Sequence, residues 1–253
     1  MTLNTDRSAR RDGKILILGG TAEARGAAEA LVALGHDIVT SLAGVTRHPH
    51  EPAGKVRKGG FGGVDVLEAY IRQNGIVLLV DAPHPFAAVM SAHAVEAAAR
   101  AGIPCIRLER PAWKPRAGDR WLRVPDIGEA AEAVPQGGRV LLTIGRKEIA
   151  PFITRPDLSG LARMIEPPDT PLPPNWTLLL ARPPFLVEAE QALMRDHGIT
   201  MLVTKNSGGR TEAKLEAARA LGIPVIMIDR PAKPPAQTAQ NVEGLVRLME
   251  AAC

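Results

Sequence analysis

A glycine-rich turn with one hydroxyl side chain is the first feature that could do chemistry. The segment Gly19-Gly-Thr-Ala-Glu-Ala-Arg25 follows a short apolar run, 14–18, and leads into a helix expected over 22–34. Glycines there let the backbone approach a phosphate, which the free N–H groups of a helix start can bind. Because Thr and Ala replace two glycines of the Gly-x-Gly-x-x-Gly pattern, a plain tight turn fits as well. The candidate cofactor contacts are Gly19, Gly20, Thr21, Glu23, Ala24 and Arg25.

The end of the next expected strand, 37–41, bears on which dinucleotide would bind. An NAD site usually has an acidic residue there, which binds the ribose hydroxyls. Here a small hydroxyl is followed by Arg47, a combination that suits the 2′-phosphate of NADPH. The alternative is that Arg47 is a solvated loop charge. The candidate cofactor contacts in this segment are Ser41, Leu42, Ala43, Gly44 and Arg47.

A proline-flanked histidine follows the apolar strand expected over 76–80. The segment Asp81-Ala-Pro-His-Pro-Phe86 starts at the carboxyl end of that strand, where open α/β sheets bind ligands. The two prolines restrict the loop and orient His84. The alternatives are a structural histidine and an Asp81 that caps the next helix. The candidate cofactor contacts are Asp81, Ala82, His84, Pro85 and Phe86.

Cationic loops mark the second half of the chain. The segments 143–148 and 204–210 combine glycine, hydroxyl and cationic side chains at strand ends, and Arg182 ends another expected strand. Such loops hold carboxylates or phosphates through backbone N–H groups and cations. The alternative is a set of helix caps and surface charges. The candidate substrate contacts are Arg146, Lys147, Arg182, Lys205, Ser207 and Arg210.

These loops need a framework, and the alternation of strands with helices predicts a parallel α/β sheet in each half of the chain. The strands are expected over 14–18, 37–41, 55–58, 76–80, 104–108, 139–144, 161–165, 176–181, 199–204 and 224–228. The helices are expected over 22–34, 64–73, 91–100, 185–197, 211–221 and 239–252. We therefore predict the α/β class, with two Rossmann-like domains and a ligand-binding cleft between them. The expected division is a flexible tail over 1–13, an NADP-binding domain over 14–110, a linker over 111–125 and a second Rossmann-like substrate domain over 126–253.

An internal repeat supports two related halves. Residues 101–115 match residues 221–235 at eight of fifteen positions, with an offset of 120 residues. Both segments contain Gly-Ile-Pro, at Gly102 and at Gly222, followed by Arg-Pro-Ala. We expect both glycines to follow helix ends and both prolines to open equivalent strands.

Composition excludes several classes of protein. The chain has 253 residues, of which 45% are apolar and 23% charged, and no apolar run reaches the roughly 18 residues of a membrane span. Two cysteines and no Cys/His cluster argue against disulfides and metal sites, and favour a cytoplasmic protein. A net charge of +4 with eight aromatic residues favours an anionic ligand over nucleic acid. The only tyrosine, Tyr70, lacks the Lys that a short-chain dehydrogenase needs four residues later.

Taken together, these motifs resemble the precorrin-6A reductase family of cobalamin biosynthesis. The matching segments are 17–25, 41–46, 60–63 (which includes Gly62), 81–87, 108–113, 143–146, 181–184 and 203–209. One departure is Pro83, where the family more often has Thr, so a hydroxyl contact there is in doubt. The resemblance implies two Rossmann-like domains, with NADPH on the first.

The resemblance also implies a reaction, the reduction of precorrin-6A to precorrin-6B by hydride transfer. The substrate would be a tetrapyrrole with many carboxylates, which suits the cationic loops. No metal is required. His84 and Lys205 are the candidate proton donors. Two alternatives stay open, namely the cobalt-containing form of the substrate and a nucleotide-binding sensor without chemistry. We expect a monomer or weak oligomer that binds neither nucleic acid nor membrane.

Overall fold

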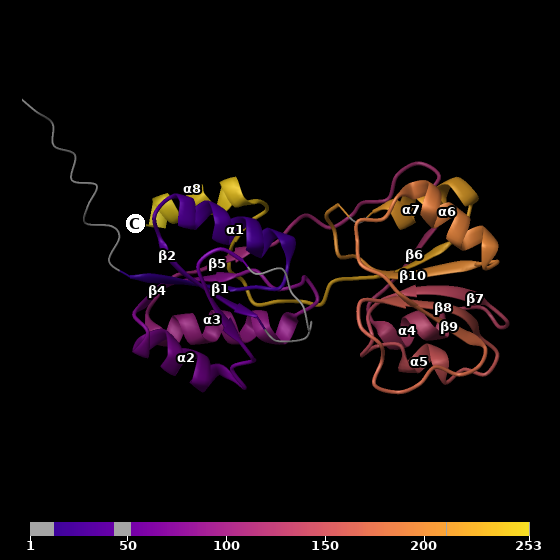
Figure 1. Cartoon of the computed structure of the whole chain (residues 1–253), viewed down its shortest axis with the longest axis horizontal. Helices are drawn as coiled ribbons and strands as arrows, with labels where there is room; N and C mark the ends of the chain where they lie inside the picture. The colour runs from indigo at the N-terminus through magenta and orange to yellow at the C-terminus, as the bar shows by residue number, and fades with distance from the viewer. Residues whose placement is uncertain (1–12, 43–51, 211, 253) are drawn as a thin grey trace, which may run out of the picture. The chain divides into compact units, whose positions relative to one another are not determined.

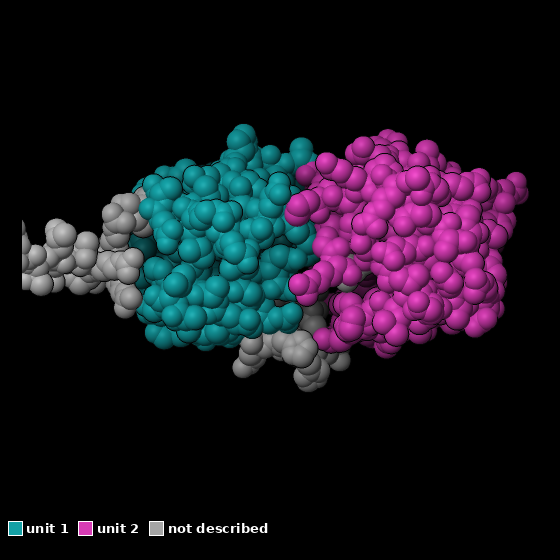
Figure 2. Space-filling view, turned by 90° about the horizontal axis from the view of Figure 1, so that it is seen from above, with its two compact units in different colours: residues 1–110, 232–253 teal, residues 111–231 magenta. Residues whose placement is uncertain are grey.

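The structure is a computed structural model that describes residues 13–42, 52–210 and 212–252. The chain forms two compact units, which are coloured separately in Figure 2. Unit 1 contains residues 1–110 and 232–253, and unit 2 contains residues 111–231. Within the described residues, no helix combines the length and apolar character needed to cross a membrane.

Unit 1 is built on a parallel six-stranded sheet in the order β12-β5-β4-β1-β2-β3. Its strands are β1 (Lys14–Leu18), β2 (Asp37–Leu42), β3 (Lys55–Lys58), β4 (Ile76–Asp81), β5 (Cys105–Leu108) and β12 (Gln237–Ala239). Strand β1 is central, with Leu18 paired to Ser41 of β2 on one side and to Asp81 of β4 on the other. The carboxyl ends of the three strands therefore lie together, as the sequence analysis requires.

Helices cover both faces of this sheet, and side chains of β1 alternate between them. Figure 1 shows α1 (Ala22–Ala33) and α8 (Val242–Ala252) on one face, with α2 (Val64–Gln73) and α3 (Ala88–Ala101) on the other. Ile17 belongs to the buried cluster that includes Leu245 of α8, whereas Leu16 belongs to the cluster that includes Leu67 of α2. This alternation explains why residues 15–18 are all apolar, since both sides of the strand are buried.

Unit 2 repeats the architecture with a parallel sheet in the order β6-β11-β10-β7-β8-β9. Its strands are β6 (Trp121–Val124), β7 (Arg139–Thr143), β8 (Ser159–Met164), β9 (Trp176–Leu180), β10 (Met201–Lys205) and β11 (Val225–Ile228). Figure 1 shows α6 (Val187–Asp196) and α7 (Ala213–Leu221) on one face, with α4 (Ile127–Glu132) and α5 (Ala150–Ile153) on the other. Leu202 of β10 packs with Met194 of α6 and Leu215 of α7 in a buried cluster.

The internal repeat corresponds to matching structure in the two units. Gly102 ends α3 with φ +73°, and Gly222 ends α7 with φ +66°, both left-handed conformations that glycine adopts readily. Strands β5 and β11 start one residue after Pro104 and Pro224. The two sheets also share one strand order. Strands β3-β2-β1-β4-β5 of unit 1 correspond to β9-β8-β7-β10-β11 of unit 2, and each sheet has one further edge strand, β12 or β6.

The added edge strands change the expected domain division. Strand β6 follows β5 in the chain but pairs with β11 in unit 2, and β12 follows β11 but pairs with β5 in unit 1. The expected second domain of 126–253 is therefore corrected, since 232–253 belong to unit 1. The expected linker of 111–125 belongs to unit 2 and contains β6. The predicted parallel α/β class is confirmed.

Candidate functional site

The glycine-rich turn after β1 lies at the carboxyl edge of unit 1. Gly20 is exposed with φ +116°, and a Cβ built on it would meet no atom within 4 Å. A Cβ on Gly19 would lie 2.8 Å from Cγ2 of Thr40, so the close approach of the turn to β2 requires glycine there. The turn is thus tight against its neighbour strand and open toward solvent.

Thr21 joins this turn to the loop after β4. Its Oγ1 caps α1 by accepting the N–H of Ala24 at 3.1 Å, and donates to the carbonyl of Ala82 at 2.9 Å. The N–H of Gly19 donates to the carbonyl of Ser41 at 2.9 Å. Three segments that the sequence separates, around residues 20, 41 and 82, therefore meet at one edge of the sheet.

Asp81, the last residue of β4, stabilises this edge of the sheet through side-chain bonds. Its carboxylate is fully buried and accepts from Nε of Arg107 at 2.9 Å and from Oγ of Ser91 at 3.1 Å. Both carboxylate oxygens of Asp81 are thus engaged inside unit 1, and the expected cofactor contact through Asp81 stays a prediction. Asp81 does not cap α3, because its bond to this helix goes to the Ser91 side chain and the N-cap residue is Ala87.

His84 is exposed in the loop that Asp81 begins. Its Nδ1 accepts the backbone N–H of Phe86 at 3.3 Å, and the two rings lie 5.8 Å apart. Pro85 between them is buried. A neutral imidazole whose Nδ1 accepts a hydrogen bond carries its proton on Nε2.

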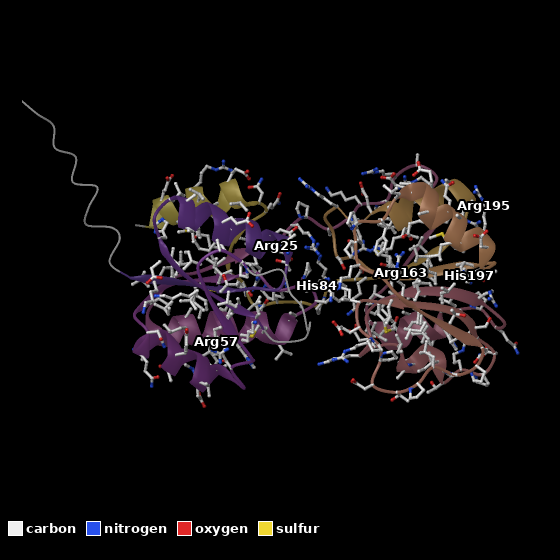
Figure 3. The ribbon with its side chains drawn as sticks, viewed as in Figure 1. Arg25, Arg57, His84, Arg163, Arg195 and His197 are labelled. Atoms are coloured by element: carbon white, nitrogen blue, oxygen red, sulfur yellow. The ribbon has the colours of Figure 1, made fainter. Side chains whose placement is uncertain are left out.

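The remaining predicted contacts of α1 differ from one another. Glu23 accepts from Nη1 of Arg110 at 2.6 Å, so its carboxylate is used within unit 1. Ala24 is buried and can offer only backbone. Arg25 is partly buried, and among the residues that the structure covers its side chain has no ion-pair partner. Figure 3 labels Arg25 and His84.

The end of β2 contains a cation that the sequence analysis missed. Ser41 and Leu42 are buried, and Arg57 of β3 donates from Nη1 to Oγ of Ser41 at 3.2 Å. Residues Ala43, Gly44 and Arg47 lie outside the described part of the chain. Gly62, with φ +79°, belongs to the turn that leads from β3 to α2. The register of β2 and β3, with Ser41 opposite Arg57, is the signal that could have identified Arg57.

In unit 2, an ion pair brings two predicted substrate loops together. Nζ of Lys205, after β10, pairs with a carboxylate oxygen of Glu148, after β7. Lys205 has a side-chain exposure of 11%, against 35% for Glu148. The paired strands β7 and β10 end side by side, which is why the loops meet.

Two other predicted cations of unit 2 are also paired with carboxylates. Arg146 donates from Nη1 to Asp169 at 3.0 Å, and Arg182 from Nη2 to Glu166 at 3.3 Å. Lys147 and Arg210 are exposed, and within the described ranges neither has an ion pair. The six predicted contacts thus divide into paired cations, solvated cations and Ser207.

The loop after β10 is rigidly anchored. The Asn206 side chain is buried and exchanges two hydrogen bonds with the backbone of Trp113, at 2.8 and 3.2 Å. Arg230 donates to the carbonyls of Asn206 and Ser207, at 2.9 and 3.1 Å. The loop that contains Lys205 and Ser207 is therefore held by the first and the last segment of unit 2, through Trp113 and Arg230.

Strand β8, which has the place in unit 2 that β2 has in unit 1, contains a buried cation. Arg163, near the end of β8, forms a buried ion pair with Glu190 of α6, with side-chain exposures of 6% and 2%. Its guanidinium carbon lies 4.0 Å from the ring centroid of Phe185. Arg163 (labelled in Figure 3) is thus part of the interior of unit 2.

Cys105 begins β5 in unit 1, opposite Leu79 of β4, and its thiol is no nucleophile at neutral pH. Burial raises the pKa of its thiol to about 12, and the nearby Asp81 carboxylate adds to the shift. The thiolate is the reactive form of cysteine. Cysteine chemistry at β5 is therefore not part of the candidate mechanism.

Comparison with known proteins identifies a family. The family model "Precorrin-6x reductase CbiJ/CobK" matches residues 14–250. The precorrin-6A reductase of Rhodococcus erythropolis is 53% identical over 92% of this chain and 96% of its own length. The cobalt-precorrin-6A reductase of Priestia megaterium is 35% identical over 86% and 90%. The solved structure "CobK precorrin-6A reductase" is 43% identical and superposes with a TM-score of 0.90, covering 95% of this chain and 97% of that one.

Proposed function

This chain belongs to the precorrin-6x reductase family, and we propose that it takes the hydride for that reaction from NADPH bound on unit 1. It is an oxidoreductase that reduces precorrin-6A in cobalamin biosynthesis. Membership of this family replaces the alternative of a nucleotide-binding sensor without chemistry. The observation that carries the cofactor proposal is the junction of the Gly19-Gly20 turn, the end of β2 and the Ala82 carbonyl at one sheet edge.

The residues of unit 1 fit a nicotinamide dinucleotide. The open turn at Gly20 and the first amides of α1 suit a pyrophosphate. Thr21 takes the amides of Ala24 and Arg25, which leaves those of Ala22 and Glu23. The end of β2 offers Ser41 and Arg57 in place of the acidic residue typical of NAD sites. In unit 2, strand β8 has the place that β2 has in unit 1, and its Arg163 is buried in an ion pair with Glu190. These differences favour unit 1 as the cofactor domain.

Reduction of a double bond needs a hydride and a proton. NADPH, when bound, supplies the hydride, which goes to a macrocycle carbon next to nitrogen. The chain holds the two reactants in line, a contribution that can reach about 7–11 kcal/mol. The Asp81–Arg107 pair fixes the loop that presents His84. His84 would donate a proton from Nε2 in its imidazolium form, in which Nδ1 no longer accepts the Phe86 N–H. Lys205 is the second candidate donor, held by Glu148.

The substrate carboxylates would meet the edge of unit 2. Lys147 and Arg210 are solvated cations and are available for new carboxylate partners. Arg146, Arg182 and Lys205 already have carboxylate partners, which a substrate carboxylate would replace. Each charge-assisted hydrogen bond of this kind contributes roughly 1.5–3 kcal/mol. Ser207 adds a hydroxyl to the same loop.

The metal-free substrate is favoured over its cobalt-containing form. Identity to the relative named for precorrin-6A is 53%, compared with 35% for the relative named for the cobalt form. A cytoplasmic location and a monomeric or weakly associated state stay predictions.

Steady-state oxidation of pyridine nucleotide with precorrin-6A tests the proposal. We expect turnover with NADPH at least about tenfold more efficient than with NADH, a difference of about 1.4 kcal/mol. We also expect metal-free precorrin-6A to be used better than the cobalt-loaded ring. Equal turnover with both nucleotides would refute the NADPH assignment, and preference for the cobalt-loaded ring would refute the substrate assignment.

A further inference from the structure

Arg57 of β3 presents a fixed cation at the end of β2. In the parallel register Arg57 lies opposite Ser41. Its Nη1 donates to Oγ of Ser41 at 3.2 Å and to the carbonyl of Gly59, and its Nη2 donates to the carbonyl of Gly60 at 3.1 Å. These bonds use three of the five N–H groups of a guanidinium, so two remain for a ligand among the described contacts.

Two aromatic rings also hold this guanidinium in place. Its carbon lies 3.9 Å from the ring centroid of Phe61 and 5.5 Å from that of Tyr70. Phe61 is buried and packs edge-on against Tyr70, with ring centroids 5.3 Å apart. The long Arg57 side chain is therefore ordered before any ligand arrives, which reduces the entropy cost of binding.

The charge at this end of the two strands is positive. The only acid of β2 is Asp37, which begins the strand and lies 3.7 Å from Lys55 at the opposite end of β3. No carboxylate occurs in the described residues 38–42 or 55–63. An acidic residue here would bind the ribose hydroxyls of NAD, whereas a planar guanidinium matches a phosphate group.

We infer that Arg57 binds the 2′-phosphate of NADPH and determines the preference of unit 1 for NADPH over NADH. The assignment rests on the proposed use of NADPH. It gives Arg57 the role that the sequence analysis assigned to Arg47. The Gly59–Gly60 carbonyls and Phe61 act as positioning groups for the guanidinium.

Calorimetric titration of the full chain tests this inference without turnover. The probes are NADPH, NADH, adenosine 2′,5′-bisphosphate and 5′-AMP. In Arg57→Ala, we expect affinity for NADPH and for the bisphosphate to fall by about tenfold or more, with NADH and 5′-AMP changed less than about twofold. Arg57→Lys should show an intermediate loss, because it keeps the charge but not the planar fork. Lys55→Ala removes the same charge from the other end of β3 and should change neither affinity.

The outcomes separate the inference from the proposed function. If the parent chain binds NADH as tightly as NADPH, the proposed use of NADPH fails. If the parent prefers NADPH and Arg57→Ala keeps that preference, the role of Arg57 is overturned, and Arg47→Ala becomes the informative variant. Thermal melts show whether Arg57→Ala is folded. If it is not, Arg57→Lys decides, and parent-like affinity for the bisphosphate in that variant overturns the inference.

Discussion

Cations at the carboxyl edge of unit 2 have different surroundings, and these differences should appear in substrate binding. Arg146 has Asp169 as a partner, whereas Lys147, the next residue, is exposed and has no ion pair among the described residues. A paired cation must exchange one carboxylate for another, which limits the gain in free energy. A solvated cation gains a new partner outright.

We expect Lys147→Ala to raise the apparent KM for precorrin-6A more than Arg146→Ala does. The rise should be about tenfold for Lys147, from the loss of one charge-assisted hydrogen bond, and only a few-fold for Arg146. Added salt should reduce the difference, because screening weakens exposed charges most. Initial rates against precorrin-6A concentration at two ionic strengths measure this. An Arg146→Ala effect larger than that of Lys147→Ala would contradict the assignment.

Local sequence determines the regular elements well where hydrophobic spacing and end signals agree. The expected strand 55–58 and helix 64–73 coincide with β3 and α2. The glycine stops at 102 and 222 are left-handed helix ends, as expected. The same turn chemistry correctly placed the Gly19-Gly20 turn between β1 and α1.

Two of the missed elements are strands whose structure comes from distant partners. Strand β6 lies within the proline-rich stretch that was expected to be a linker, and β12 has only three residues. Each forms by pairing with a strand far away in the sequence. Arg57 was missed for the same reason, since only the pairing of β3 with β2 places it beside Ser41.

Gly208 shows how a single element depends on a close backbone contact. Its φ is +68°, and a Cβ there would lie 2.1 Å from the carbonyl oxygen of Pro111. Gly222 has nearly the same φ, +66°, but a Cβ there meets nothing within 4 Å. The two glycines therefore separate the cost of a left-handed backbone from the cost of a steric clash.

We expect Gly222→Ala to lower the free energy of unfolding by about 1–2 kcal/mol, the cost of the left-handed conformation. Gly208→Ala should cost at least about 1 kcal/mol more, because the Pro111 contact must also open. Urea unfolding of both variants measures the difference. Equal losses would show that the 205–209 loop is not held by Pro111.

At the scale of the whole chain, the exchanged edge strands make each unit depend on a segment from the other half of the sequence. Helix α8 follows β12, and its Leu245 is fully buried in the core of unit 1 with Leu31 of α1. Residues 14–110 alone would lack this cover. The cofactor unit is therefore discontinuous in sequence.

We expect Leu245→Ala to destabilise unit 1 by about 2–5 kcal/mol, the usual cost of truncating a buried leucine. Hydrogen exchange of the full chain should rise in β1, β5 and α1, with β7 and β10 little changed. Increased exchange confined to unit 2 would contradict the placement of α8. The substitution should also weaken NADPH binding, since α1 carries part of the proposed site.

Transfer of a labelled hydride tests the central claim most directly. The parent chain is incubated with precorrin-6A and each of the two NADPH stereoisomers that have deuterium at C4 of the nicotinamide, and the product is examined by mass spectrometry. We predict that one stereoisomer gives precorrin-6B with a single deuterium, and that the other gives unlabelled product. Unlabelled precorrin-6B from both stereoisomers, or no reduction of precorrin-6A, would contradict direct hydride transfer from NADPH on this protein.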